Sequence, residues 1–163
     1  MAEQGHGAEG VAQMRQGLAA WRATGAKLSE PSLLSMLAEA YGKDRQTDEG
    51  LTLVAEALAA VHITGERSWE ADLYRLKGKL VLAQSIDNAT EAATYFQQAL
   101  DIARRQQAKS LELRAAMSLA RLWQQQGKRA EAHALLAPVY GWFTEGFDTA
   151  DLKDAKALLD KLA

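Results

Sequence analysis

The residues of this sequence that could do chemistry are three histidines and a few close pairs of acids. His6, His62 and His133 are scattered, without the HxxxH or HExxH spacing that brings two imidazoles to one metal ion. The acids at 48–49 and 70–72 fall near expected helix starts, where a carboxylate complements the helix dipole. No set has catalytic spacing, so we expect a chain that is not an enzyme and needs no metal or cofactor.

Other classes of function are excluded by composition. The chain of 163 residues has no cysteine, so disulfides, thiol catalysis and zinc fingers are ruled out. The glycine-rich "GHGAEG" follows no strand and precedes no Lys-Ser/Thr, so it is not a phosphate loop. Nineteen basic and 21 acidic residues nearly balance, which argues against nucleic acid or membrane as a partner. The start "MAEQGHGAEG" is not typical of a signal peptide, and we expect a cytoplasmic protein.

The elements that must position any site are helices. Ala, Leu, Gln, Glu, Lys and Arg are abundant, prolines number two, and no run alternates with the period of a strand. Apolar residues recur with helical spacing in segments separated by short turns. The segments expected to be helical are about 9–23, 30–42, 48–62, 68–83, 90–106, 109–125, 129–143 and 149–162.

These segments repeat a pattern. In the second helix of each pair, a small residue follows the turn. These small residues lie 40, 42 and 40 positions apart, and they are Gly10, Gly50, Ala92 and Ala132. Larger residues follow four positions later, and they are Met14, Val54, Phe96 and Leu136. In the first helices we align Leu34, Leu37, Ala38 and Tyr41 with Leu73, Leu76, Lys77 and Leu80, and these with Ala116, Leu119, Ala120 and Trp123. This alignment needs three extra residues in the turn of the middle pair. Small residues let paired helices approach closely, so the pattern predicts helix pairs stacked in a row.

The pattern resembles the tetratricopeptide repeat. "LSMLAEAYGKDRQTDEGLTLVAEAL", "LYRLKGKLVLAQSIDNATEAATYFQQAL" and "AMSLARLWQQQGKRAEAHALLAPV" carry most of its positions. The period departs from the usual 34 or so residues, which indicates longer helices, and HEAT or armadillo pairs are the alternative. "WRATGAKLSEPSLLSMLAEAYG", "DLYRLKGKL" and "YGWFTEGFDTADLKDAKALL" are similar to the repeats at the carboxyl end of bacterial cyclase–ATPase signalling proteins.

The resemblance implies an all-α fold, a right-handed superhelical array of antiparallel helix pairs, or α-solenoid. Its expected parts are a tail (1–8), repeats over 9–143 (a half repeat 9–25, then pairs 30–64, 68–106 and 109–143) and a capping helix (148–163). In the cap, Leu152, Ala155, Leu159 and Leu162 should point inward. The helix at 9–23 aligns with the second helix of each pair, and the helix that would form the first half of its pair is missing. We therefore expect either a natural boundary further upstream or a face covered by dimerisation.

The resemblance also implies a non-catalytic scaffold that binds an extended or helical protein segment in its concave groove. The partner would be another protein or another domain of the same parent chain. Carried over from the family, the outward residues of the first helices are Ser35, Glu39, Tyr74, Gly78, Arg114, Met117, Arg121 and Gln124. Alternatives are an array that senses a small effector, and a module that forms homodimers through its exposed first helix.

Two further features concern the carboxyl half. Residues 101–130 hold seven basic side chains against two acidic ones, and this end could receive an acidic partner or be ordinary solvated helix surface; the basic ones are Arg104, Arg105, Lys109, Arg114, Arg121, Lys128 and Arg129. The segment "YGWFTEGF" (140–147) is dense in aromatic residues. We expect it to seal the last pair against the capping helix, with an exposed docking patch as the alternative.

Overall fold

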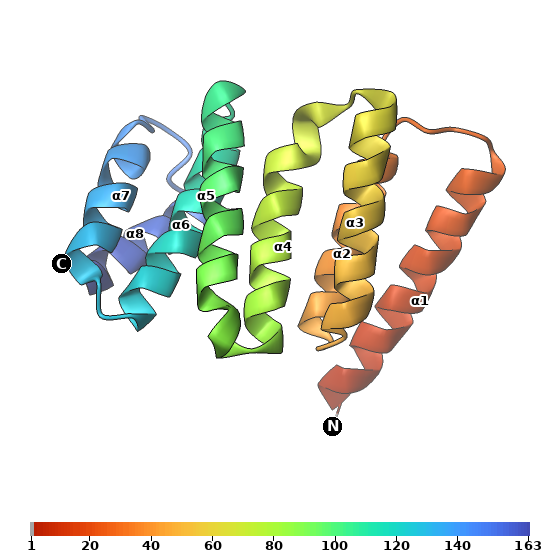
Figure 1. Cartoon of the computed structure of the whole chain (residues 1–163), viewed down its shortest axis with the longest axis horizontal. Helices are drawn as coiled ribbons and strands as arrows, with labels where there is room; N and C mark the ends of the chain where they lie inside the picture. Colours follow the sequence, from red (N-terminus) through yellow and green to blue (C-terminus); the bar gives the residue numbers. More distant parts are fainter. Residues whose placement is uncertain (1) are drawn as a thin grey trace.

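The protein is helical throughout the part that its computed structural model describes, which is residues 2–163, with side chains from Gly7 onwards. Eight α-helices and two short 3-10 helices follow one another (Figure 1). The α-helices are α1 (Ala2–Ala23), α2 (Glu30–Lys43), α3 (Thr47–Thr64), α4 (Glu70–Gln84), α5 (Ala89–Arg105), α6 (Lys109–Gln125), α7 (Arg129–Gly141) and α8 (Ala150–Leu162). The 3-10 helices are η1 (Arg67–Trp69) before α4 and η2 (Ile86–Asn88) before α5.

The helix boundaries lie close to those expected, with one correction at the amino end. Residues 2–8, expected to form a tail, belong to α1; no proline interrupts them, although Gly5 and Gly7 are weak helix formers. The chain leaves α1 through Gly25, which has a φ of 75° that glycine adopts without steric cost. Pro31 lies in the first turn of α2, where its missing N–H needs no partner.

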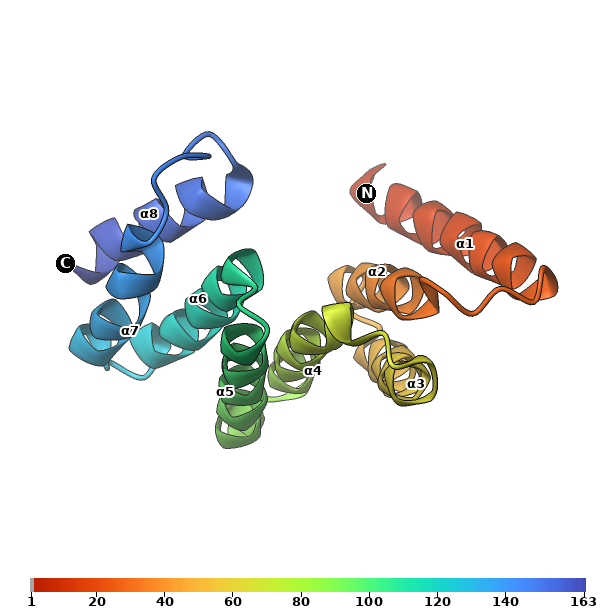
Figure 2. The ribbon, with the colours of Figure 1, turned by 90° about the horizontal axis from the view of Figure 1, so that it is seen from above.

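The helices are arranged in chain order along an open arc. Neighbouring helices run in opposite directions (Figure 1). Seen from above, α2, α4 and α6 line the inner side of the arc and α3, α5 and α7 its outer side (Figure 2). Each inner helix contacts the outer helix that follows it and also the next inner helix, and α8 packs against α6 and α7. We call α2, α4 and α6 the inner helices.

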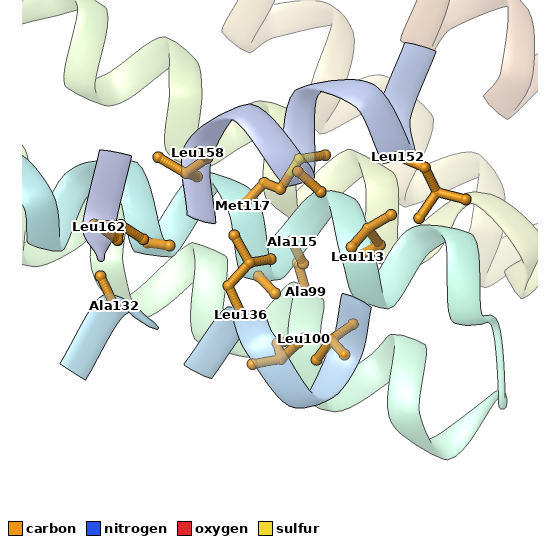
Figure 3. Packing of buried hydrophobic residues seen from close by; sticks show 14 residues of the cluster. Ala99, Leu100, Leu113, Ala115, Met117, Ala132, Leu136, Leu152, Leu158 and Leu162 are labelled. Carbon is orange, nitrogen blue, oxygen red and sulfur yellow. The ribbon is translucent and has the colours of Figure 1, made fainter. Parts of the chain in front are cut away.

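The core lies between the two rows and follows the repeated pattern of the outer helices. Val54, Phe96 and Leu136 are at most 2% exposed, and the small residues Ala92 and Ala132 are fully buried. Residues that the sequence pattern aligned in α3, α5 and α7 thus share a buried position. In the last pair, side chains of α5, α6, α7 and α8 form one cluster (Figure 3). Leu152, Ala155, Leu158 and Leu162 of α8 are buried in it, so Leu158 takes the place expected for the half-buried Leu159.

The inner helices correct the predicted alignment of the middle pair. An ideal Cβ on Gly78 would lie 2.6 Å from the ring of Phe96 and 3.1 Å from the carbonyl oxygen of Ala92. Gly78 is thus the residue of α4 that meets the small residue of its partner helix. In α2 this position belongs to Ala38, whose carbonyl oxygen would lie 3.2 Å from a Cβ on Gly50.

The equivalent of Ala38 is therefore Gly78, and the predicted equivalence with Lys77 is wrong by one residue. The corrected row of α4 is Tyr74, Lys77, Gly78 and Val81. The leucines that suggested the other alignment pack against the preceding pair, and they are Leu73, Leu76 and Leu80. The two small residues of a pair are 12 positions apart in the first pair (38 to 50) and in the last pair (120 to 132), and 14 positions apart in the middle pair (78 to 92). The middle pair therefore has two extra residues, not three, and they fall in the connection that contains η2.

Candidate binding surface on the inner helices

The predicted groove residues divide into those that reach the surface and those that do not. Arg121 is exposed, and Glu39, Arg114 and Gln124 are half-buried. Ser35 is 5% exposed and Met117 4%, so both are inside, and the expectation that they point outward is wrong. Met117 packs in the cluster of the last pair together with Leu152 and Leu158 of α8 (Figure 3).

The two residues predicted on α4 point away from the inner side. Gly78 is pressed against α5, and Tyr74 stacks on Tyr95 of α5 with ring centroids 6.4 Å apart. Tyr74 also packs against the core of the last pair. The one-residue error in alignment is the cause, because it rotates each choice by about 100° around the helix. The corrected positions are Arg75 and Lys79.

A row of charged side chains occupies the inner side once the alignment is corrected. We call this surface the inner face; its residues are Glu39 and Lys43 of α2, Asp72, Arg75 and Lys79 of α4, and Arg114 and Arg121 of α6. The field at Lys79 includes contributions from Glu39 and Lys43, and that at Arg114 includes contributions from Asp72 and Glu39. Charges from all three inner helices therefore act on one another across a single surface.

The most buried ion pair of this surface lies in the middle of the arc. Arg75 donates from Nε to Asp72 Oδ1 at 2.8 Å, and the side chains are 11% and 8% exposed. The residues are one helical turn apart, so α4 alone positions them. Sequence reasoning passed over this pair, although acids and bases at positions 72, 75 and 79 follow one stripe of a helix.

Lys79 has an unusual environment for a lysine that reaches solvent. Burial lowers the pKa of its amine, and the positive charge of Arg75 lowers it further. The negative charge of Glu39 raises the pKa of Lys79. Lys43 lowers it and Asp72 raises it, both by less than Glu39 does. Lys79 as a whole is exposed, yet enough protein surrounds its amine for burial to be the largest cause. An incoming anion would relieve this cost by pairing with the charged amine.

Arg114 fixes the inner face to the capping helix. Its Nε donates to Asp151 Oδ2 of α8 at 2.7 Å, and this hydrogen bond is the main cause of the raised pKa of Arg114. Arg121 lies further along α6 beside a hollow of about 370 Å³ between α6 and α8. Asp154 and Lys161 of α8 line the same hollow. Lys79 and Arg121 have no salt-bridge partner among the described side chains.

Much of the expected basic end is occupied within the fold. Glu112 is buried and accepts hydrogen bonds from Arg104 at 3.0 Å and Lys109 at 2.8 Å. Burial alone would raise the pKa of Glu112, but these two hydrogen bonds outweigh it and hold the pKa below its usual value. Arg129 donates to the carbonyl oxygen of Lys161 at the end of α8.

The aromatic segment 140–147 is partly packed in the core and partly exposed. Tyr140 and Phe143 pack against the core of the last pair, as expected for a seal. Trp142 is 58% exposed and Phe147 46% exposed. The amine of Lys109 lies 5.5 Å from the centroid of the Trp142 ring, within the range of a cation–π interaction.

The histidines lie apart from this surface. His62 and His133 are on exposed positions of α3 and α7, and His6 falls outside the described side chains. Among side chains 7–163, no three His, Asp or Glu residues are grouped as metal ligands would be. None of the helices in this same part of the chain is long and apolar enough to cross a membrane.

Comparison with known proteins does not add a family to these observations. No family model matches the sequence. No curated protein matches it either.

Proposed function

We propose that this chain is a non-catalytic scaffold built as a right-handed α-solenoid of tetratricopeptide-like pairs, and that its inner face binds a protein segment. The supporting observation is the corrected register. Glu39, Lys79 and Arg121 occupy the same position in three successive inner helices, 40 and 42 residues apart. A surface that offers one polar side chain per repeat suits an extended or helical ligand lying across the helices.

The charges of the inner face favour an acidic segment. The carboxylates of Asp72 and Asp151 are already engaged by Arg75 and Arg114. Glu39 lies 3.6 Å from the amine of Lys43. Among the cations of the inner face, Lys79 and Arg121 have no such partner in the described structure, so carboxylates of a ligand would find two sites. Because Lys79 is partly desolvated, its pairing should contribute more than that of a fully solvated lysine.

A photo-crosslinking experiment tests this function. The full chain carries p-benzoylphenylalanine at Gln124, which lines the hollow beside Arg121, or at Gln98, an exposed position of the outer helix α5. Crosslinking is done in cells of the source organism, and the products are identified by mass spectrometry. We expect one polypeptide to be captured from position 124 and lost when Arg121→Glu is added.

The control and the result that contradicts the proposal come from the same samples. Capture of the same polypeptide from position 98, or capture that is unchanged by Arg121→Glu, would show that the inner face is not the binding surface. Resemblance to the repeats of bacterial cyclase–ATPase signalling proteins supplies the first candidate to examine among the products. That candidate is another domain of such a protein, and the role of the chain would then be regulatory.

A further inference from the structure

At the end of the arc, α1 and α2 form a surface that is open, whereas the equivalent surfaces of the following helix pairs are covered. We call it the socket, and its residues are Gly10 and Met14 of α1 and Met36 and Ala40 of α2. They line a hollow of about 450 Å³ with Glu39, Lys43 and Asp44 at its rim. No atom lies within 4 Å of an ideal Cβ on Gly10, whereas Met14 is 40% and Met36 54% exposed.

The same positions in the next pairs are filled by an inner helix. In the pair that follows, they are Gly50, Val54, Leu76 and Leu80, and Val54, Leu76 and Leu80 cluster with Ala38 of α2. One pair further they are Ala92, Phe96, Ser118 and Leu122, where Ala92, Phe96 and Leu122 cluster with Val81 of α4. In the last pair Ala132 and Leu136 of α7 lie in one cluster with Ala116 and Ala120 of α6. The inner helices thus occupy three surfaces of this kind.

Exposure shows how different the socket is from these counterparts. Met14 corresponds to Val54, Phe96 and Leu136, which are 0%, 2% and 0% exposed. Met36 corresponds to Leu76, which is 2% exposed. Covering Met14 and Met36 together would remove apolar area from water, which is favourable.

We propose that the socket binds an amphipathic helix of a partner protein, in the place that an inner helix takes on each following pair. The chain itself defines the chemistry of this helix. α2 presents Leu34, Leu37, Ala38 and Tyr41 to its partner helix, and α6 presents Ala116, Leu119, Ala120 and Trp123. These two helices share a small residue, an apolar residue just before it and an aromatic residue three positions later; α4 shares only the small residue, with Lys77 and Val81 at the other two positions. The small residue is required because the backbones of paired helices approach closely at Gly50 and at Gly78.

This site is separate from the acidic-segment site of the proposed function. It depends on the packing of the helix pairs and not on the identity of the ligand of the inner face. Glu39 and Lys43 are the only residues named for both surfaces. The two can therefore be tested by different substitutions.

The test uses the full chain, labelled with ¹⁵N, and a synthetic peptide of residues 27–46, which contains α2. This peptide is the helix that covers the equivalent surface of α3 and α4. We expect the amide signals of Gly10 and Ala40 to shift on titration, and the signals of α6 to stay in place. A peptide with Ala38→Gln should bind less tightly, because its bulky side chain prevents the close approach.

Two substitutions in the chain complete the test. Gly10→Gln fills the hollow and Met36→Glu places a charge in it, and both act at positions open enough to preserve helicity and the thermal midpoint. Together they should weaken peptide binding by about tenfold or more. Lys79→Glu/Arg121→Glu, which should abolish crosslinking on the inner face, should leave peptide affinity unchanged.

Three results would overturn the assignment. They are a peptide that shifts no signal of the socket, binding that survives Gly10→Gln/Met36→Glu, and a chain that dimerises in sedimentation through the socket. The last would make a second copy the occupant in place of a partner helix.

Discussion

Gly78→Ala is the substitution for which the structure makes the sharpest statement. In an open helix interior, replacing glycine by alanine stabilises by up to about 1 kcal/mol. At position 78 the new Cβ would lie 2.6–2.7 Å from two atoms of the Phe96 ring and 3.1 Å from the carbonyl oxygen of Ala92. These distances are well inside the roughly 3.5–4.0 Å at which carbon atoms attract one another.

The cost is set by how far the neighbours can move. Phe96 is 2% exposed and packs among Val81, Leu119 and Leu122, so its ring has no free space to enter. Overpacking of this kind costs about 1–3 kcal/mol, because α4 and α5 must separate. Because the Phe96 ring is enclosed, the upper part of this range applies, and after a gain of about 1 kcal/mol in helix propensity we expect a net loss of about 1–2 kcal/mol. For a chain of this size that lowers the thermal midpoint by about 2–8 °C.

Thermal and urea unfolding followed by circular dichroism would measure this loss. Gly17→Ala is the matched control, since it lies inside α1 and no atom is within 4 Å of its ideal Cβ. It should leave the midpoint unchanged or raise it. Adding Phe96→Leu to Gly78→Ala should cost less than Phe96→Leu costs alone. If Gly78→Ala raised the midpoint as Gly17→Ala does, the close contact of α4 and α5, and the corrected alignment with it, would be refuted.

Three other predictions concern the charged residues. Asp72→Ala leaves the largely buried Arg75 unpaired and should lower the free energy of unfolding in urea by about 2–3 kcal/mol; a loss as small as that of Asp160→Ala, whose ion pair with Lys156 is exposed, would contradict it. The pKa of Glu112 is depressed in the folded state, so its stabilisation is present above its unfolded pKa, close to 4.5, and is lost as pH falls through the lower folded pKa. Glu112→Gln should therefore lower the thermal midpoint at pH 7 and flatten its fall on acidification, and parallel profiles of variant and wild type would be the contrary result. The lowered pKa of Lys79 means that its charge opposes folding below that pKa, an effect that fades as pH rises toward 10.5. Lys79→Met should raise the midpoint at pH 7 and less so near pH 10.5, whereas a gain independent of pH would assign it to packing alone.

The helices could be predicted closely from the sequence because each carries its own periodicity and turn signals. The small residues Gly50, Ala92 and Ala132 could also be placed, since in the outer helices one apolar stripe faces one partner. In α4 this reasoning failed. Its leucines at 73, 76 and 80 pack against the preceding pair, and its own partner meets Tyr74 and Gly78, so two stripes competed for the alignment.

The candidate site was predicted less well for the same reason. A shift of one residue moved the choice on α4 from Arg75 and Lys79 to Tyr74 and Gly78, which point away from the inner face. On α6, Arg121 is exposed as expected, but Met117 of the same helix is buried. The ion pairs of Asp72 with Arg75 and of Arg114 with Asp151 depend on side-chain directions and, in the second case, on where α8 returns. Sequence spacing does not contain that second kind of information.

The sequential arrangement of the helices has a consequence for how the chain folds. The main contacts join a helix to its neighbour or to the next helix but one. Such local topology favours fast folding, because little loop entropy must be lost before contacts form. During synthesis, α2 would find all the surface it buries once α4 has left the ribosome, without waiting for α8. Folding can therefore proceed one pair at a time behind the growing end, and the pair containing α6 is the last to close, when α8 arrives.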